Sequence, residues 1–336
     1  MNALKRFAIP KDVFKAIVPA ALAFGLPVRN ELSFCSSSLY SKDLESAKKM
    51  MVGAESVDLF VDSNTVVGIG DGSTTYYAIK RIQEKLSTGK LENVIVLPLT
   101  DKIKKTCISF NIPTTEWDWD AHLGTETVDP PNLDLVISGV DEIDVKFNMI
   151  KGGNGSLFRE KLATAIAKKI VVICDDSKLS KNLGPGVPLP VEIYPSNFEA
   201  TRKALEALPS LKGCRAYLRT GTIGYRAHDG DIKAVTDNGN FIIDLYFSKP
   251  IHDLDQALKE LNGTKGVFCH GLFLNDHTRT VNLIVGNRKG VDVFTNNSRP
   301  LYWWSEIKTK QGLDRQALDN RIPVISADQI TNEMKP

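Results

Sequence analysis

The chain has 336 residues, and its 42 lysine and arginine residues nearly balance 40 aspartate and glutamate residues, which leaves a formal net charge of +2. This balance argues against a nucleic-acid-binding surface over the whole protein, because phosphate contacts need a clustered excess of basic side chains. The composition, 42% hydrophobic and 24% charged, is typical of a folded protein of roughly two domains, and it excludes a collagen, a coiled coil and a membrane-spanning protein.

The first forty residues differ in composition from the rest. Lys5 and Arg6 precede an apolar run at 16–28, which is too short to span a bilayer and is followed by a hydroxyl-rich stretch at 35–41. This layout predicts that residues 1–40 are a presequence that directs the protein to a plastid. The alternative is a disordered extension with one amphipathic helix on a cytoplasmic protein.

A helix, a strand and a glycine-rich turn are predicted next along the chain. Apolar residues at helical spacing predict a helix at 43–60, and a short β-branched run at 65–69 predicts a buried strand. The turn at 70–75, GDGSTT, leads into a helical pattern at 77–86. N–H groups and hydroxyls at a helix N-terminus stabilise an anion, so this turn is a candidate phosphate loop. Alternatively, its glycines only permit a tight turn and a hydroxyl caps the helix.

Strands and helices continue to alternate after this turn. Strands are predicted at 91–97, 134–138 and 170–174, and a helix is predicted at 157–169. This alternation implies βαβ units. The fold class is therefore α/β, with a mostly parallel sheet that carries helices on both faces.

The pattern changes after a proline-rich stretch at 185–190. The predicted elements there are a strand at 191–193, a helix at 197–208, strands at 232–235 and 241–245 joined by a turn, and a helix at 253–261. They indicate a smaller inserted α+β domain of the ferredoxin-like type, after which an apolar run at 280–285 rejoins the first domain. The predicted organisation is an α/β catalytic domain at 41–190 and 267–294, an α+β domain at 191–266, and a C-terminal tail at 295–336.

Four motifs follow one another in the α/β part of the chain. They are SGVDE at 138–142, KGGN at 151–154, REK at 159–161 and DDSK at 175–178. Together with the glycine-rich turn, they resemble the ribose-5-phosphate isomerase family of the A type. That family pairs a G-[TS]-G-S-T phosphate loop with D-G-A-D-E, K-G-G-G, R-E-K and D-[ED]-S-K segments in this order. The resemblance covers about residues 46–293, most of the chain.

The resemblance implies an aldose–ketose isomerase that interconverts D-ribose 5-phosphate and D-ribulose 5-phosphate through an enediolate. Such a reaction moves a proton between adjacent carbons, so no cofactor and no metal are expected. The expected partner is a small sugar phosphate, not a nucleic acid or a membrane, and the family suggests a homodimer or homotetramer. The pathway would be the pentose phosphate pathway or the Calvin cycle. The five cysteines are widely spaced and form no C-x-x-C pair, so they predict no zinc site.

By resemblance, three residues are catalytic. Glu160 is the base that shuttles the proton, Lys151 supplies positive charge near the developing enediolate, and Asp141 hydrogen-bonds the sugar hydroxyls. Glu160 should lie in the first turn of a helix near Lys151, which would favour its ionised form. Each residue also has a purely structural interpretation: a complement to the helix dipole, a solvated lysine and an Asx turn, respectively.

Other residues are expected to hold the phosphate and the sugar. Lys178 and the hydroxyls of Ser73 and Thr74 would bind the phosphate, and either Lys48 or Lys49 is the counterpart of a further phosphate-facing lysine of the family. The full predicted substrate-binding set is Asp71, Gly72, Ser73, Thr74, Ser138, Gly139, Val140, Asp141, Lys151, Gly152, Gly153, Asn154 and Lys178.

Two residues depart from the family pattern inside this site. Ser138 replaces the first aspartate of D-G-A-D-E, which the family uses for ring opening, and serine is a poor proton carrier near neutral pH. Asp71 replaces a Thr or Ser of the phosphate loop, and a carboxylate beside a phosphate costs on the order of 1 kcal/mol or more. These changes leave an alternative open: a catalytically impaired paralogue that binds sugar phosphate as a sensor, or that acts on a related sugar phosphate.

Overall fold

The computed structural model describes residues 28–117, 131–223, 227–275 and 278–296. The chain divides into two compact units, Met1–Ala47 and Lys48–Pro336. Helix α2 (Val28–Phe60) begins in the first unit and ends in the second, so it starts earlier in the chain than the predicted helix at 43–60. Most of the predicted presequence and tail lies outside the described residues. Within the described ranges, no helix is both long and apolar enough to cross a bilayer.

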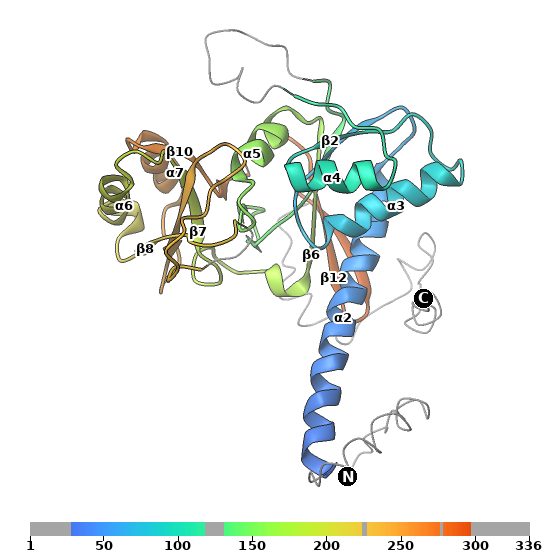
Figure 1. The fold of residues 1–336 in the computed structure, drawn as a ribbon, viewed down its shortest axis with the longest axis horizontal. Coiled ribbons are helices and arrows are strands. Elements are labelled where there is room, and N and C mark those ends of the chain that lie inside the picture. The colour runs from blue at the N-terminus through green and yellow to red at the C-terminus, as the bar shows by residue number, and fades with distance from the viewer. Residues whose placement is uncertain (1–27, 118–130, 224–226, 276–277, 297–336) are drawn as a thin grey trace. The chain divides into compact units, whose positions relative to one another are not determined.

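A six-stranded sheet forms the centre of the second unit (Figure 1). Its strands, in spatial order, are β13 (Gly290–Thr295), β12 (Val281–Asn287), β6 (Lys169–Asp175), β3 (Leu135–Gly139), β1 (Val66–Ile69) and β2 (Ile95–Pro98). All neighbouring pairs are parallel except β12 and β13. This arrangement confirms the predicted mostly parallel sheet.

Helices cover both faces of this sheet, because its strands carry apolar side chains on both sides. On one face, the end of α2, α3 (Thr75–Ser87) and α4 (Asp101–Ser109) pack in one buried cluster with strand residues such as Val67. On the other face, α5 (Leu157–Ile166) contributes Ala163 to a second cluster with Val172. The sheet is therefore the middle of three layers.

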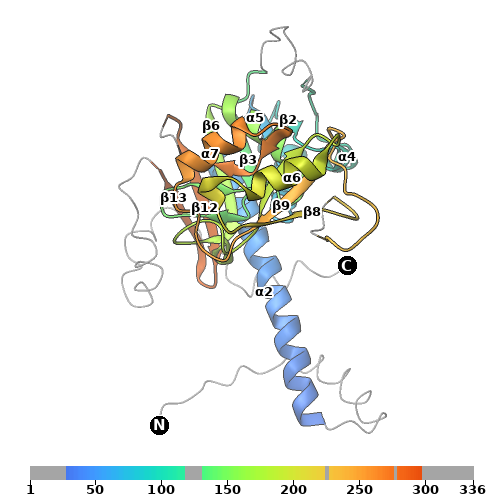
Figure 2. The same ribbon diagram turned by 90° about the vertical axis from the view of Figure 1, so that its left-hand side faces the viewer.

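A four-stranded antiparallel sheet forms the second architectural element. Its order is β10 (Val267–His270), β7 (Leu189–Ile193), β9 (Phe241–Tyr246) and β8 (Arg215–Leu218). Figure 2 shows α6 (Phe198–Glu206) and α7 (Leu254–Gly263) on one face of this sheet, where they share an apolar core with it. The chain order β7-α6-β8-β9-α7-β10 is the split βαβ pattern of the ferredoxin-like fold, in agreement with the predicted fold class.

Two details of this sheet differ from the sequence prediction. The predicted strand at 232–235 forms only isolated bridges, whereas β8 pairs with β9 along its full length. β8 lacked a clear pattern because it contains Arg215 and alternates in burial at the sheet edge. The second sheet also includes β10, so it extends beyond residue 266. The proposed domain boundaries themselves stay a prediction.

A short three-stranded sheet combines two strands that follow β3 with one strand that follows β10. It consists of β11 (Leu272–Phe273), β5 (Met149–Ile150) and β4 (Glu142–Ile143). Because β5 ends at Ile150, it fixes the start of the loop that carries Lys151. The backbone N–H of Lys151 donates to the carbonyl of Gly271 at 2.9 Å, which anchors this loop further.

Candidate active site

Three of the predicted segments follow neighbouring parallel strands. The loop from Asp71 to Thr74 follows β1, Ser138 and Asp141 lie at the end of β3, and Lys178 ends a short 3₁₀ helix, η2 (Asp176–Lys178), after β6. Since β1, β3 and β6 are adjacent and parallel, these segments emerge at one edge of the sheet. In open α/β sheets this carboxyl edge is where ligands bind.

Glu160 and Lys151 form a buried ion pair. Glu160 lies in the first turn of α5, and its Oε2 is 2.9 Å from Lys151 Nζ. The Lys151 ammonium also donates to Ser138 Oγ at 2.9 Å and to the carbonyl oxygen of Gly139. Lys151 and Glu160 are 2% and 4% exposed, so the structural interpretation of Lys151 as a solvated lysine is wrong.

Burial raises the pKa of the Glu160 carboxyl above its usual value. Lys151 opposes this shift, while the negative charges of Asp141 and Asp71 add to it. The net direction is opposite to the one expected from the sequence, because the desolvation of a buried carboxylate outweighs the attraction of Lys151. A carboxyl group with a raised pKa can exchange protons closer to neutral pH, which suits a general base.

Gly70 leaves room for the Glu160 carboxylate. A Cβ atom on Gly70 would lie 3.0 Å from Glu160 Oε1 and 2.8 Å from the Cβ of Ser138. No side chain fits between these groups without displacing one of them. The glycine that ends β1 is therefore required by the contact with Glu160 and not only by the turn that follows.

The glycine-rich loop after Lys151 is held against Asp141. The N–H of Gly153 donates to Asp141 Oδ2 at 2.7 Å. Gly152 has a φ of +91°, and its missing side chain leaves space for Leu157 at the start of α5. Gly139 and Val140, both in the predicted set, provide the backbone between Ser138 and Asp141, and Val140 is buried.

The candidate phosphate loop ends at the N-terminus of α3. Gly72 accepts backbone and hydroxyl hydrogen bonds from Tyr76 and Thr75 at 3.2 and 2.9 Å. Thr74 occupies the N-cap position, but its side chain makes no capping hydrogen bond, and Ser73 is exposed. The capping interpretation of this turn therefore fails for Thr74, and the loop keeps the arrangement that favours an anion.

Asp71 is paired with a lysine that the sequence did not single out. Lys102 Nζ, from the first turn of α4, lies 3.0 Å from Asp71 Oδ1. The Asn154 side chain donates to the backbone carbonyl of Asp71 at 3.3 Å. Asn154 and Asp71 thus contact each other, and Lys102 balances the negative charge of Asp71.

The second phosphate-binding segment is η2, which contains Lys178. The Asp175 side chain accepts from the N–H of Ser177 at 2.9 Å and so caps this short helix. Lys48 Nζ lies 2.6 Å from Asp176 Oδ1. The sequence left the choice between Lys48 and Lys49 open, and this contact brings Lys48 beside the Lys178 segment.

The sequence analysis did not identify two residues, distant in sequence, that support the glycine-rich loop. Arg219 directly follows β8, Asp244 lies in β9, and both are fully buried. Arg219 donates to the carbonyl of Gly153 at 2.8 Å, across 66 positions of sequence. No motif marks these residues, because the contact joins segments that are far apart in the sequence.

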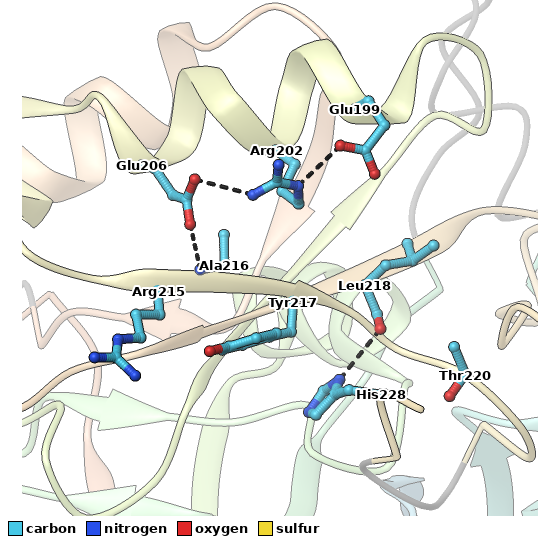
Figure 3. Close-up of a pocket in the computed structure, with 9 residues that line it drawn as sticks. All are labelled: Glu199, Arg202, Glu206, Arg215, Ala216, Tyr217, Leu218, Thr220 and His228. Carbon is cyan, nitrogen blue, oxygen red and sulfur yellow. Dashed lines mark hydrogen bonds and ion pairs between the residues drawn. The ribbon is translucent and has the colours of Figure 1, made fainter. Parts of the chain in front are cut away.

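A separate cavity of about 560 Å³ lies at the edge strand β8 (Figure 3). None of the predicted site residues lines it. Arg202 on α6 is held there between Glu199 and Glu206, at 3.0 and 2.9 Å. Among the described residues, no group of three or more His, Cys, Asp or Glu side chains is arranged to bind a metal ion.

Comparison with known proteins shows the family of this chain. Residues 96–290 match the family described as ribose 5-phosphate isomerase A (phosphoriboisomerase A). Probable ribose-5-phosphate isomerase 1 of Arabidopsis thaliana is 41% identical over 235 residues, which cover 70% of this chain and 82% of the relative. Ribose-5-phosphate isomerase of Plasmodium falciparum is 36% identical over 233 residues, 69% of this chain and 91% of the relative.

Solved structures agree with these relatives. A structure of ribose 5-phosphate isomerase from Plasmodium falciparum superposes with a TM-score of 0.64 at 33% identity, and covers 74% of this chain and 97% of its own. A D-ribose-5-phosphate isomerase in complex with phospho-erythronic acid gives a TM-score of 0.63 at 31% identity, with 74% and 97% covered. This chain belongs to the ribose 5-phosphate isomerase A family.

Proposed function

We propose that this protein interconverts D-ribose 5-phosphate and D-ribulose 5-phosphate, with Glu160 as the base. The observation that carries the proposal is the buried ion pair between Glu160 and Lys151, 2.9 Å apart, at the sheet edge where the candidate phosphate loop begins. The names of the relatives at 36–41% identity support the same activity.

In this mechanism, Glu160 removes the proton from C2 of the open-chain aldose and returns it to C1. The electron pair of the broken C2–H bond forms the C1=C2 double bond, so the negative charge of the enediolate lies on the oxygen of C1. A proton passes from the C2 hydroxyl to this oxygen, which leaves a carbonyl at C2 when C1 receives its proton. Lys151 would stabilise that charge, and its contacts with Glu160 and Ser138 support this role. Such preorganised charge in a buried site contributes more than it would in water.

The proton shuttle needs Glu160 to change between its two forms. Burial disfavours the carboxylate, and Lys151 favours it. Burial is the larger of the two effects, so the pKa of Glu160 stays raised. A base with a raised pKa also returns the proton to carbon more readily than an ordinary carboxylate.

The rest of the site would hold the substrate in place. Asp141, fixed by the N–H of Gly153, would accept from the sugar hydroxyls. The N–H groups at the start of α3, the hydroxyls of Ser73 and Thr74, and Lys178 would bind the phosphate. Holding both ends of the sugar phosphate fixes C1 and C2 near Glu160.

Ser138 favours one alternative to a fully active isomerase. Serine stands where the family has the aspartate that opens the sugar ring, so this position holds no carboxylate. The Ser138 hydroxyl instead accepts a hydrogen bond from Lys151. If ring opening then fails, the protein would bind a sugar phosphate as a sensor, or act on a related one. The retained Glu160 argues for turnover, since binding alone does not require a base.

Turnover and binding can be separated in one experiment. The purified full-length chain, dialysed against a chelator, should convert ribose 5-phosphate to ribulose 5-phosphate at a rate well above that of the buffer. The measurement is direct detection of the ketose. Binding of ribose 5-phosphate, seen as a rise in the melting temperature, without ketose formation would refute the isomerase proposal and favour the sensor.

Lys102 should protect phosphate binding from the charge of Asp71. In Lys102→Ala the carboxylate is left unpaired beside the phosphate loop, so KM should rise about fivefold with little change in kcat. The double variant Asp71→Thr with Lys102→Ala removes both charges and should return KM close to the wild-type value. Steady-state kinetics at constant ionic strength measure both. An unchanged KM in Lys102→Ala would mean that Asp71 does not influence the phosphate.

The name of one relative also supports a location for this protein in the cell. A relative from Arabidopsis thaliana, 36% identical over 275 residues, is named a probable chloroplastic ribose-5-phosphate isomerase. This name supports the plastid location that the composition of residues 1–40 predicts, with photosynthetic carbon fixation as the pathway. A homodimer or homotetramer stays a prediction.

A further inference from the structure

A buried arginine joins the four-stranded sheet to the glycine-rich loop of the site. Arg219 follows β8, and both it and Asp244 in β9 are 0% exposed. Arg219 Nε donates to one carboxylate oxygen of Asp244 at 2.8 Å, and Nη2 donates to the other. The remaining nitrogen, Nη1, donates to the carbonyl of Gly153 at 2.8 Å. Nη1 also donates to the carbonyl of Ile223 at 3.4 Å. One guanidinium therefore joins the four-stranded sheet to the glycine-rich loop.

The strand pairing does not need this guanidinium. The N–H of Arg219 donates to Ile242 at 2.8 Å, and its carbonyl accepts from Ala234 at 3.0 Å, so the backbone of Arg219 is already fixed. A buried ion pair is in general no more stabilising than well-packed apolar residues of the same size. This pair differs from an ordinary buried ion pair because Arg219 also donates to the carbonyl of Gly153, outside the sheet.

Gly153 in turn holds a predicted substrate-binding carboxylate. Its N–H donates to Asp141 Oδ2 at 2.7 Å. The neighbouring Gly152 and Gly155 have φ values of +91° and +94°, in the region that favours glycine. A loop with this much conformational freedom takes its position from outside contacts. The carbonyl and the N–H of Gly153 are two such contacts, one to Arg219 and one to Asp141.

We propose that Arg219 is a positioning residue for the isomerisation, which holds Gly153 so that Asp141 faces the sugar. Asp244 keeps the guanidinium in place by binding it through both oxygens. The inference rests on the proposed function, because Asp141 contributes only if the site binds a sugar phosphate. An arginine suits this task, since its planar fork can serve a carboxylate and a carbonyl at once, whereas a lysine ammonium is a single point.

The test is Arg219→Lys in the full-length chain, because the charge remains and the fork is lost. We expect kcat/KM for ribose 5-phosphate to fall about 10- to 100-fold. The inhibition constant of inorganic phosphate should stay unchanged, because inorganic phosphate uses the phosphate loop and not Asp141. If Arg219 acts through Asp141, the double variant Arg219→Lys with Asp141→Asn should be no slower than Asp141→Asn alone.

Arg202→Lys is the matched control. Arg202 also binds two carboxylates, but at the surface of α6 (Figure 3), and its replacement should leave both constants unchanged. Should Arg219→Lys fail to fold, Asp244→Asn keeps the shape of the pair and should show the same selective loss. Failure of both variants to fold would assign the pair to stability alone and overturn the inference.

Other outcomes separate the inference from the proposed function. An active wild-type chain with normal kcat/KM in Arg219→Lys would overturn the inference alone. The inference would also be overturned if the losses of kcat/KM from the two substitutions multiplied in the double variant. It would likewise be overturned if Arg219→Lys weakened inhibition by phosphate as much as it lowered kcat/KM. A wild-type chain that forms no ketose would overturn the proposed function, and the inference with it.

Discussion

Glu160→Gln should lower kcat by about 10²- to 10⁴-fold, the range for removing a general base. Glutamine has nearly the same shape as glutamate but cannot accept the C2 proton. The side chain is 4% exposed and 2.9 Å from Lys151, so a water molecule cannot readily take its place. The measurement is ketose formation from ribose 5-phosphate under saturating substrate. Inhibition by inorganic phosphate should persist in the variant, which would show that the site is intact.

Glu192→Gln is the matched control for this substitution. Glu192 is likewise a fully buried glutamate whose pKa is raised by burial. It lies in β7 and accepts hydrogen bonds from Thr236, Asn238 and Asn240 in the turn that precedes β9. Its replacement should change the melting temperature more than kcat. A Glu160→Gln variant with wild-type turnover would remove Glu160 as the base.

The sequence predicted those parts of the molecule that depend on neighbours in the chain. The β-branched runs and the helical spacing predicted the parallel sheet, which β1, β3 and β6 confirm. The short motifs predicted the family, which the match over residues 96–290 confirms. The roles of Glu160 and Lys151 stay predictions. The expectation that the two residues lie close together is confirmed by their ion pair.

Contacts between distant segments could not be predicted. Arg219 and Gly153 are 66 positions apart, and Lys102 and Asp71 are 31 apart. In the sequence, Lys102 is one of several lysines in an ordinary surface helix, and Arg219 lies next to a weakly patterned strand. The contacts of both residues depend on how distant segments pack together, and a single sequence does not specify this packing.

The direction of the Glu160 pKa also depended on three-dimensional information. From the sequence, a helix N-terminus and a nearby lysine both favour the carboxylate. The structure adds complete burial and the negative charges of Asp141 and Asp71, and burial is the largest of these effects. Desolvation cannot be read from residue types, because the same REK motif on an exposed helix would have a carboxylate with an ordinary pKa.

Lys151→Met should combine a loss of turnover with a shift in pH dependence. Methionine keeps much of the unbranched stem but removes the charge that would stabilise the enediolate, so kcat should fall about 10²- to 10³-fold. Lys151 is also the group that lowers the pKa of Glu160. Without it, the pKa rises further, and a higher pH is needed to ionise the base. The acidic limb of the kcat/KM profile should therefore move to higher pH.

The same variant should lose stability in a pH-dependent way. With its pKa raised in the folded state, Glu160 binds more protons folded than unfolded between its ordinary and its raised pKa. The free energy of unfolding therefore falls as pH rises through this window. Lys151→Met should be about 3 to 5 kcal/mol less stable than wild type above the raised pKa, where an unpaired carboxylate would be buried. At pH values below the ordinary pKa of a glutamate, the carboxyl is protonated. There the variant and the wild type should differ less in their free energy of unfolding.

Lys168→Met provides the contrast, because Lys168 pairs with Asp134 at the surface, where its side chain is 61% exposed. Exposed pairs contribute little, so this variant should keep the wild-type pH profile and stability. Denaturant unfolding and kcat/KM measured across the pH range test both variants. If Lys151→Met has an unshifted acidic limb and a pH-independent loss of stability, Lys151 does not control the ionisation of Glu160, and the proposed division of roles between the two residues is wrong.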